Sequence, residues 1–595
     1  MTQPTPTSTP HPIQQYWQLL ARYLRPQRGR VAVMTVALLG GITLQLIHPQ
    51  VLARFIDVAV ADATADALLN LALMYIGVAL GEQVLRVVSV YAASSVGWTA
   101  TNALRADLAA HCMSLDLAFH KTRTPGELIE RVDGDVTTLS RFFSQFIIII
   151  LGNGLLLVGV VIALFFVHPL AGIGGLIFTV AALLLMLRLR NIAVPYFRDY
   201  RQQAADFYGF AGEQLTGRED INANGAHGFF LRRLFEINQA WMLVYHKARL
   251  ASTTLWASTD ATFALGSVLA LTIGALLFQG DLISIGMVFL IFNYFSQLAR
   301  PITQIREEIE LFQQADASIQ RIRELLDTES RLDAGGETRI PDGAFALVFD
   351  KVSFHYDDPD SDEERDWALR DIDFELPAGE TLGLLGRTGS GKSTTARLLL
   401  RLYDPQHGEI RLNNVPLRES PLTDLRQRVG LVTQDVQIFE ASVRDNITFF
   451  DDRIPDRQVV EAFALLGLTS WFETLPNGLD TPLGSDGRGL SAGEAQLVAF
   501  ARVFLKQPGL IILDEASSRL DPLTERLIEQ AIDRLLEGRT GIIIAHRLAT
   551  VQRADRIVVL ENGHVVEYGK RAELAQTPDS RFSALLRAGQ MDLLA

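Results

Sequence analysis

The chain has 595 residues, of which 48% are hydrophobic and 21% are charged, and its formal net charge is −14. This composition is too apolar for a disordered chain, and the negative charge disfavours nucleic acid as a partner. The single cysteine, Cys112, excludes a disulfide scaffold, a cysteine zinc site and an iron–sulfur cluster. Uncharged runs long enough to cross a bilayer precede residue 300, so a purely soluble enzyme is excluded as well.

The N-terminal segment is polar before it becomes amphipathic. Residues 1–12 are rich in Pro and Thr and lack the charged start and apolar core of a cleavable signal peptide, so we expect a disordered tail. From Ile13, apolar residues recur at helical spacing beside Arg22 and Arg25, which favours a short amphipathic helix in the membrane interface. An ordinary surface helix is the alternative.

Six predicted spans follow, and each reaches the roughly 17–25 residues that cross a bilayer. They cover Val31 to Ala53, Ala67 to about Asn102, Phe143 to Val167, Pro169 to Leu187, Ala261 to Gly280 and Leu282 to Ala299.

The connections between the spans alternate between long and short. The long connections follow the second and fourth spans and are rich in Arg and Lys, whereas the short ones carry acids. This bias predicts a multi-pass protein of the cell inner membrane with its N-terminus and long loops in the cytoplasm. Helical periodicity continues into the long loops, so we expect helical stalks with docking turns near Arg123 to Leu128 and near Tyr208 to Glu213.

Three acidic or basic residues fall at membrane depth. Glu82 and Arg86 lie four residues apart on one helix face, which favours a structural ion pair over a substrate site. Asp260 has no obvious partner nearby in the sequence. It is either a functional residue or a helix residue near the cytoplasmic face or in a wet cavity.

The C-terminal half has the pattern of a soluble domain. Residues 327–344 are polar with Gly and Pro and indicate a linker. From residue 345, short β-rich runs alternate with helical patterns, which is typical of a parallel α/β sheet. The predicted organisation is a tail at 1–12, a transmembrane domain at 13–326, the linker, and an α/β domain at 345–595.

The strongest motif is the run from Gly386 to Ser393, which fits G-x-x-x-x-G-K-[ST]. It follows an apolar strand, Thr381 to Leu385, and opens a helix, Ser393 to Leu402, which is the context that a phosphate loop requires. We expect Lys392 to reach the β- and γ-phosphates and Ser393 to ligate Mg²⁺. The predicted nucleotide-binding positions here are Gly386, Arg387, Thr388, Gly389, Ser390, Gly391, Lys392, Ser393 and Thr394.

An acidic pair ends a second apolar strand, Gly509 to Leu513. Asp514 can hold Mg²⁺ directly or through water, and Glu515 can orient or deprotonate the attacking water. Lys392 and Glu515 are therefore predicted catalytic residues.

Further motifs occur in an order typical of one family. They are VSFHY before the phosphate loop, VTQDVQIF and LSAGE between that loop and Asp514, and SSRLDP and IIIAHRL after it. The chain thus resembles the ATP-binding cassette (ABC) superfamily, specifically bacterial exporter-type half transporters, including multidrug or lipid exporter subunits of heterodimers. The fold class implied is an all-α six-helix transmembrane domain followed by an α/β P-loop NTPase domain. The resemblance covers nearly the whole chain.

The resemblance implies a role for one or two residues in each motif. It implies that Tyr356 stacks on adenine, that Gln434 contacts Mg²⁺ and relays to the membrane domain, and that His546 is a catalytic residue contacting the γ-phosphate. The signature and D-loop positions that it adds to the nucleotide site are Ser491, Gly493 and Asp521. The runs TRTPGELIERVDGDVTTL and GEQLTGREDINANGA resemble the two coupling loops that dock on the cassettes.

The mechanism implied by the resemblance needs two chains. Two cassettes sandwich two ATP molecules head to tail, and the closed dimer shifts the membrane domains toward outward opening. The predicted function is ATP-driven export of an amphipathic small molecule, drug or lipid, with ATP hydrolysis coupled to transport. The alternatives are uptake of a metal chelate of the siderophore kind by an exporter-shaped protein, and an ATP-gated channel or regulatory subunit.

The sequence departs from the family pattern at three positions. Ala492 and Glu494 stand where the signature usually has Gly and Gln, and Arg519 stands where the D-loop usually has a small residue. These departures favour pairing with a different half transporter, a heterodimer, over a homodimer. The acidic insertion at 357–366 is interpreted as a solvated loop.

Overall fold

The structure is a computed structural model, and its described residues form two compact units. One unit is built from residues before 114 together with Pro125–Thr328, and the other from Ser114–Thr124 together with residues from Glu329 onward. The predicted tail and the acidic insertion lie outside the described residues. The described ranges are 21–61, 64–142, 149–356, 367–484, 490–514, 522–544 and 548–588.

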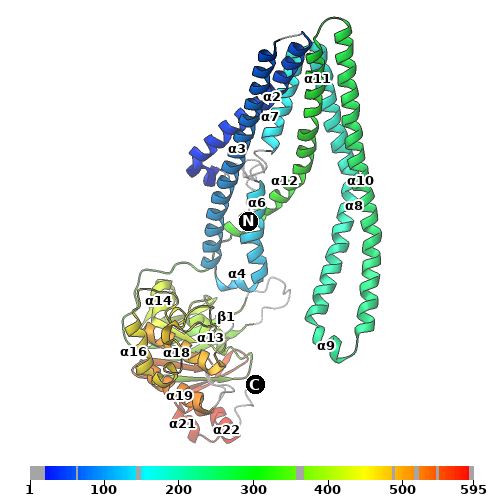
Figure 1. The fold of residues 1–595 in the computed structure, drawn as a ribbon. Helices are drawn as coiled ribbons and strands as arrows, with labels where there is room; N and C mark the ends of the chain where they lie inside the picture. The colour runs from blue at the N-terminus through cyan, green and yellow to red at the C-terminus, as the bar shows by residue number, and fades with distance from the viewer. Residues whose placement is uncertain are drawn as a thin grey trace, which may run out of the picture. The chain divides into compact units, whose positions relative to one another are not determined.

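The first unit is helical (Figure 1). Its described residues include six helices long and apolar enough to cross a membrane, which confirms the six-helix transmembrane domain. The third predicted span is described only from Ile149 onward. The long helices of this unit are α2 (Arg28–Val60), α3 (Ala65–Ser114), α7 (Gly152–Val167), α8 (Pro169–Thr216), α10 (His227–Gln279), α11 (Ile285–Gln297) and α12 (Ala299–Leu326).

Three of these helices are much longer than a bilayer is thick. At about 1.5 Å per residue, the 50 residues of α3, the 48 residues of α8 and the 53 residues of α10 correspond to roughly 70–80 Å, against a hydrocarbon core of about 30 Å. Helices α8 and α10 run side by side along the unit and meet at α9 (Arg218–Ala223) (Figure 1). The stalks predicted from the sequence are therefore present in this unit.

The tip of the second stalk differs from its predicted position. The run from Tyr208 to Glu213 lies inside α8, and the chain turns only after Thr216, through α9 and Asn224–Ala226. Gly225 has a positive φ of 64°, a conformation that suits glycine and ends the helical run there. The remaining short elements of the unit are η1 (Arg25–Gln27), α5 (Pro125–Ile129), the π-helical turn η2 (Glu130–Asp135) and α6 (Val136–Arg141).

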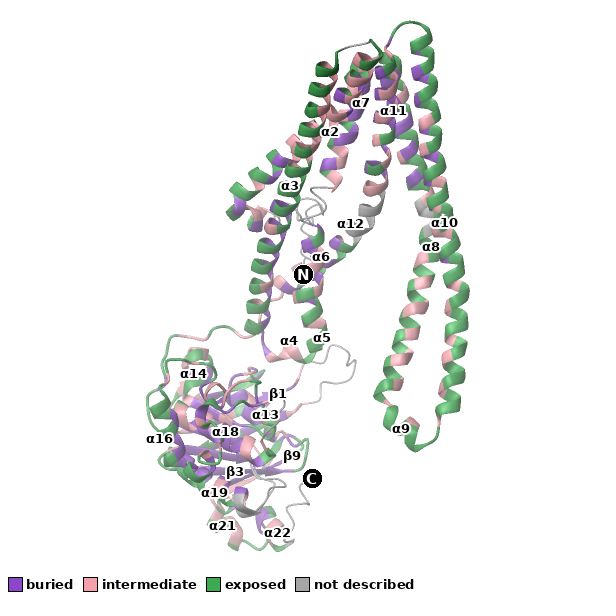
Figure 2. Ribbon diagram, viewed as in Figure 1, coloured by how far each residue is buried: buried purple, intermediate pink, exposed green. Residues whose placement is uncertain are grey.

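The membrane unit buries its own apolar core and leaves apolar side chains outside. Its core includes Val160, Leu164, Ala270 and Ile291, all fully buried. Figure 2 shows the outer faces of α3, α8 and α10 as largely exposed. Large apolar side chains such as Leu184 on α8 lie on these faces, as expected for helices that contact lipid.

The second unit contains two sheets. The strands β1 (Leu347–Phe354), β2 (Leu369–Leu376), β4 (His407–Leu412) and β5 (Val415–Pro416) form an antiparallel sheet in the order β2-β1-β4-β5. The other sheet has the order β10-β9-β3-β8-β7-β6 and is parallel except for β10. Its strands are β3 (Thr381–Gly386), β6 (Val429–Val432), β7 (Leu510–Asp514), β8 (Thr540–Ile544), β9 (Arg556–Glu561) and β10 (His564–Lys570).

Helices pack against the larger sheet, and its inner strands are fully buried (Figure 2). The sequences of strands β3 and β8 are nearly continuous apolar runs, because other parts of the unit cover both faces of these strands. The helices and turns of this unit are α13 (Lys392–Leu399), η4 (Leu417–Glu419), α14 (Leu422–Arg428), α15 (Val443–Thr448), α16 (Asp456–Leu466), α17 (Thr469–Phe472), η5 (Gly478–Asp480), α18 (Ala492–Lys506), α19 (Pro522–Leu536), α20 (Leu548–Val551), α21 (Arg571–Gln576) and α22 (Arg581–Ala588).

The segment Ser114–Thr124 belongs to the second unit although it lies within the predicted transmembrane domain in the sequence. It carries α4 (Leu117–Lys121), whose N-cap Asp116 accepts a hydrogen bond from the Phe119 amide at 2.9 Å. The other carboxylate oxygen of Asp116 accepts from the Arg331 amide at 2.6 Å. Leu117 packs against an apolar core of this unit. Packing and hydrogen bonds to backbone amides therefore hold the segment in the second unit.

Candidate functional site

The predicted phosphate loop lies between a buried strand and a helix. Strand β3 ends at Gly386, and α13 starts at Lys392. Gly389 and Gly391 have positive φ angles of 82° and 107°, which glycine adopts without strain. The helix is shorter than predicted and ends at Leu399, because Arg401 adopts a left-handed φ of 46°.

The loop leaves no room for larger residues at two of its glycines. A Cβ at Gly386 would lie 2.4 Å from the Leu560 carbonyl oxygen, and one at Gly391 would lie 2.9 Å from that of Ala368. Arg387, Thr388 and Gly389, in the turn between them, are exposed residues. Successive backbone N–H groups at a helix N-terminus form a cradle for phosphate oxygens.

Two side chains of the loop have geometry suited to a bound anion. Lys392 is 6% exposed, and its ammonium donates to the carbonyl oxygens of Gly386 at 2.6 Å and Arg387 at 3.1 Å. The hydroxyl of Ser390 is buried with no hydrogen-bond partner within the described residues. Ser393, which follows Lys392, is exposed and accessible to a cation. These residues fit a magnesium-bound nucleoside phosphate.

Tyr356 stands beside this loop. Its hydroxyl lies 3.1 Å from the Thr394 hydroxyl and accepts a hydrogen bond from Arg397 at 2.9 Å. Edge-to-face contacts with Phe354 and Tyr403 hold the ring, with centroids 4.9 and 5.3 Å apart. The ring is thus anchored to the helix that follows the phosphate loop and is oriented by its aromatic neighbours.

The Lys121 ammonium lies 4.2 Å from the centroid of the Tyr356 ring. This separation is within the range of a cation–π interaction. Lys121 comes from α4, so the segment Ser114–Thr124 contributes directly to the surroundings of the predicted adenine-stacking residue.

Other predicted site residues lie at the carboxyl edge of the parallel sheet. Asp514 ends β7, and Gln434 follows β6 and is exposed. The carboxyl ends of parallel strands meet at one edge, which is also where the phosphate loop leaves β3. Glu515, Asp521 and His546, which are also predicted site residues, lie outside the described residues, as does Arg519.

The signature segment caps a helix. Ser491 precedes α18, and its hydroxyl accepts from the Glu494 amide at 3.2 Å, while the Glu494 carboxylate accepts from the Ser491 amide at 2.7 Å. The buried indole of Trp471 donates to the same carboxylate at 3.1 Å. Glu494 is therefore held by two donors at the N-terminus of the helix, where a negative charge is favourable. Gly493 is buried in the first turn.

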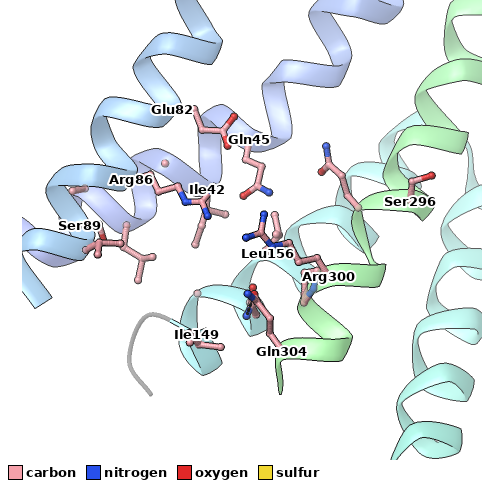
Figure 3. Close-up of a pocket in the computed structure, with 18 of the residues that line it drawn as sticks. Ile42, Gln45, Glu82, Arg86, Ser89, Ile149, Leu156, Ser296, Arg300 and Gln304 are labelled. Atoms are coloured by element: carbon pink, nitrogen blue, oxygen red, sulfur yellow. Dashed lines mark hydrogen bonds between the residues drawn. The ribbon is translucent and has the colours of Figure 1, made fainter. Parts of the chain in front are cut away.

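A cavity of about 690 Å³ with both polar and apolar lining residues lies within the membrane unit (Figure 3). It is bounded by α2, α3, α7 and the junction of α11 with α12. Its lining includes Gln45, Glu82, Arg86, Arg300 and Gln304.

The predicted ion pair between Glu82 and Arg86 is wrong. The Glu82 carboxylate lies 3.7 Å from Nδ1 of His48 on α2, and the salt bridges of the described residues do not include Arg86. His48 on the neighbouring helix is closer to Glu82 than Arg86, which lies one turn away on the same helix. This is because α2 packs beside α3 at this level (Figure 3). Asp260 lies on α10, is exposed and is not in the cavity lining.

Sequence reasoning missed three candidate residues, Lys121, Trp471 and Arg300. Lys121 and Trp471 carry no motif, because their positions depend on packing between distant segments. Arg300 could have been found from the sequence, because it is a charged residue immediately after the last predicted span, which ended at Ala299. A charge at that depth is itself a functional indication.

Two family models match the chain. The model of the ABC transporter transmembrane region matches residues 31–302, and the model of the ABC transporter matches residues 369–518. The two matches fall on the membrane part and on the part that holds the phosphate loop.

Relatives match over nearly the full length. The ATP-dependent lipid A-core flippase of Salmonella typhimurium is 30% identical, covering 94% of this chain and 96% of the flippase. The ATP-dependent lipid A-core flippase 1 of Colwellia psychrerythraea is also 30% identical, covering 94% of each chain. The ABC transporter ATP-binding protein YfiC of Bacillus subtilis is 29% identical, covering 93% of this chain and 91% of that protein.

A solved bacterial Atm1-family ABC exporter with ATP bound has the same fold. It matches with a TM-score of 0.77 and 24% sequence identity, covering 94% of this chain and 98% of that chain.

Proposed function

Because the chain belongs to the ABC transporter family, we propose that it exports amphipathic small molecules, drugs or lipids as one half of a dimeric transporter. ATP-driven transport of the exporter type is the activity of its family, and ATP hydrolysis is coupled to that transport. The observation that carries the proposal is the glycine cradle around the buried Lys392 ammonium, fused in one chain to six helices of membrane-spanning length.

The nucleotide would bind at the carboxyl edge of the parallel sheet. Lys392 would move from the loop carbonyls to the β- and γ-phosphates, and Tyr356 would stack on the adenine. Ser393, Gln434 and Asp514 would hold Mg²⁺, which would supply positive charge to stabilise the phosphoryl group during transfer. Glu515 would position or deprotonate the attacking water, and His546 would contact the γ-phosphate.

A second half transporter would complete the site. Ser491 and Gly493 of one chain would contact the ATP held by the other chain's phosphate loop, with Asp521 at the same interface. The anchored carboxylate of Glu494 would place negative charge beside that nucleotide, which weakens the affinity of this composite site for ATP. We therefore favour a heterodimer in which the partner supplies the standard signature to this chain's phosphate loop.

The proposed cycle is alternating access. ATP binds the closed cassette dimer more tightly than the open one, so it shifts the membrane domains toward outward opening, and hydrolysis permits reopening. The excess of Arg and Lys in the long loops orients the N-terminus and the nucleotide-binding domain toward the cytoplasm of the inner membrane.

The test is transport by oriented vesicles that contain the chain and its genomic neighbour. We expect ATP-dependent uptake of fluorescent amphiphiles into inside-out vesicles, and its loss with Lys392→Ala. ATP-dependent accumulation in right-side-out vesicles would indicate import and would favour uptake of a chelate over export. Downhill flux without ATP hydrolysis would indicate a channel. ATPase activity that is robust and cooperative in the chain alone would favour a homodimer.

A further inference from the structure

The chain crosses between its two units three times. It leaves the membrane unit at the end of α3, returns to it at Pro125 after the segment Ser114–Thr124, and leaves it again after Thr328, beyond the end of α12. Helices α8 and α10 turn at α9 and stay within the membrane unit. The covalent path between the nucleotide-binding unit and the membrane helices therefore runs through these three crossings.

A polar contact ties the first crossing to the third. His111 lies near the end of α3, and its Nε2–H group donates to the carbonyl oxygens of Leu325 at 2.9 Å and Thr328 at 3.1 Å. Carbonyl oxygens only accept, so this nitrogen carries the hydrogen. The two carbonyls lie at the C-terminus of α12, where backbone oxygens run out of partners within a helix. The end of α3 thus binds the end of α12.

Two ion pairs tie the second crossing to the third. Asp135, at the end of the π-helical turn η2, is 1% exposed, and both of its oxygens accept from Arg321 of α12, one of them from Nε at 2.9 Å. Arg131, in the same turn, is 8% exposed and donates to Glu127 at 2.9 Å and to Glu324 of α12 at 3.5 Å. A carboxylate held by two donors of one guanidinium group is fixed in orientation as well as in distance.

The remaining pair of crossings is joined as well. Arg105 of α3 lies 2.9 Å from the Asp133 carboxylate of η2, and it donates to the Thr137 hydroxyl of α6 at 2.8 Å. Elements η2 and α6 pack beside α12 (Figure 1). Each crossing is thus bound to the other two by side chains. We call these contacts, namely those of His111, Arg105–Asp133, Arg131–Glu324 and Arg321–Asp135, the crossing clamp.

Stability alone is a poor explanation of the crossing clamp. Arg321 lies roughly 24 Å along the helix from Ile305, where the last apolar span ends, at about 1.5 Å per residue. Ion pairs near water contribute little to stability, and the desolvation of a buried carboxylate offsets much of its attraction to a cation. Such contacts do select one arrangement of the elements that they join. The clamp includes every pair of crossings, which points to positioning.

We propose that the crossing clamp makes the three crossings move as one body, with Asp135 and Arg321 as the positioning residues on which this depends. The inference rests on the proposed function, because it assigns residues to the coupling of ATP binding and hydrolysis to transport. With the clamp closed, α3, α6 and α12 follow a displacement of the nucleotide-binding unit together. With the clamp broken, that unit still binds and hydrolyses ATP, but the membrane helices no longer respond as a set.

The experiment measures amide hydrogen exchange of the chain with its genomic neighbour in nanodiscs, with and without Mg-ATP. The Glu515→Gln background is used so that bound nucleotide is not turned over. With the clamp intact, we expect ATP to change exchange in α3, α6 and α12. In Asp135→Asn and in Arg321→Gln these changes should fall at least threefold, while the changes at the phosphate loop persist. Without Glu515→Gln, both variants should hydrolyse ATP within about twofold of the unaltered rate.

A double variant tests whether the two residues act as a pair. Asp135→Asn combined with Arg321→Gln should lose no more of the response than either change alone, because one contact is removed in each case. Additive losses would show that the residues act separately and would overturn their assignment as a pair. Loss of the changes at the phosphate loop together with those in the membrane helices would indicate damage to the fold and no role in coupling.

A milder variant and its matched control do not disturb a buried charge. Glu324→Gln removes a carboxylate that is 57% exposed and pairs with Arg131, and it should reduce the response of α12 about twofold. Glu236→Gln removes a carboxylate that is 54% exposed and lies 2.9 Å from Arg233 on α10, a helix without a crossing. It should leave the response unchanged. Equal effects of the two substitutions would overturn the proposal.

The two proposals fail in different ways. If hydrolysis depends on Lys392 but ATP changes exchange in the membrane helices equally with the clamp intact or broken, transport stands and the clamp is wrong. The clamp is also wrong if ATP binds and leaves those helices unchanged in the intact chain. If no hydrolysis depends on Lys392, the proposed function is wrong, while an ATP response that requires Asp135 still supports the clamp.

Discussion

The Lys121 ammonium lies over the ring of Tyr356, 4.2 Å from its centroid. The two residues come from distant parts of the sequence, because Lys121 lies in the segment between two membrane helices and Tyr356 follows the first strand of the nucleotide-binding domain. If Tyr356 stacks on adenine, the base and the ammonium compete for contact with this ring. The contact would then report nucleotide occupancy to the segment that carries α4.

Replacing Lys121 by Ala should strengthen nucleotide binding. A cation–π contact at a partly exposed site contributes about 0.5–1 kcal/mol, so its removal should tighten binding roughly threefold. Binding of a fluorescent ATP analogue to the purified chain measures this directly. Arg123→Ala removes a cation of the same segment that lies over Phe119, 5.1 Å from that ring's centroid. An equal gain in the control would show a general charge effect.

Tyr356 should act through its ring more than through its hydroxyl. Tyr356→Ala removes the stacking surface and should weaken ATP binding roughly tenfold, within the range of about 1–3 kcal/mol for base–aromatic stacking. Tyr356→Phe keeps the ring but loses the bond from Arg397, and should cost less than threefold. A titration of ATP against each variant separates the two. If both variants bind alike, the ring does not stack on the base.

Glu515→Gln should separate binding from turnover. The amide is isosteric with the carboxylate and cannot accept the proton of the attacking water, so hydrolysis should fall at least a hundredfold. ATP affinity should stay within about twofold, because Lys392 and the loop backbone still hold the phosphates. Parallel assays of phosphate release and equilibrium ATP binding test this. Near-normal hydrolysis in a contaminant-free preparation would remove Glu515 from the catalytic role.

Glu494 should stabilise the nucleotide-binding domain through helix α18. Glu494→Ala loses the bonds from Ser491 and Trp471 and should lower the free energy of unfolding by about 1 kcal/mol. Glu494→Gln keeps one acceptor oxygen and should cost less. The thermal midpoint of the nucleotide-binding domain in the full chain is the measurement. An unchanged midpoint in Glu494→Ala would mean that the capping box contributes nothing to stability.

Gly286 should tolerate no larger residue. A Cβ at this position would lie 2.2 Å from the Ala53 carbonyl oxygen and 2.6 Å from the Asp57 carboxyl carbon. The same carboxylate accepts from the Gly286 amide at 2.7 Å and ties α2 to the start of α11. Gly286→Ala should therefore lower the thermal midpoint in detergent, at a cost of about 1–3 kcal/mol.

The matched glycine substitution is Gly228→Ala, since no atom lies within 4 Å of the added Cβ there. It should leave the midpoint unchanged, because Gly228 is the second residue of α10 and the added methyl group contacts no other atom. A loss in both variants would show that the effect is not due to the contact with α2.

Local signals explain why much of the fold could be predicted. Hydropathy found the spans because each is a continuous apolar run, and the phosphate loop follows from glycine spacing between a strand and a helix. The pairing of Glu82 was mispredicted because i,i+4 spacing on one helix says nothing about His48 on the next. The contacts of Lys121 and Trp471, and the convergence of Arg86 with Arg300, likewise depend on tertiary packing that no local pattern encodes.

The segment Ser114–Thr124 leaves the membrane helices, packs into the nucleotide-binding unit, and returns. A nucleotide-binding domain expressed from Glu329 onward would thus lack the segment Ser114–Thr124, which belongs to the same compact unit. It would expose the apolar patch that Leu117 and Ala118 pack against, and the Arg331 amide would lose Asp116. A truncated or chimeric protein that contains this nucleotide-binding domain should therefore also contain α4, either as a separate peptide or joined by a linker.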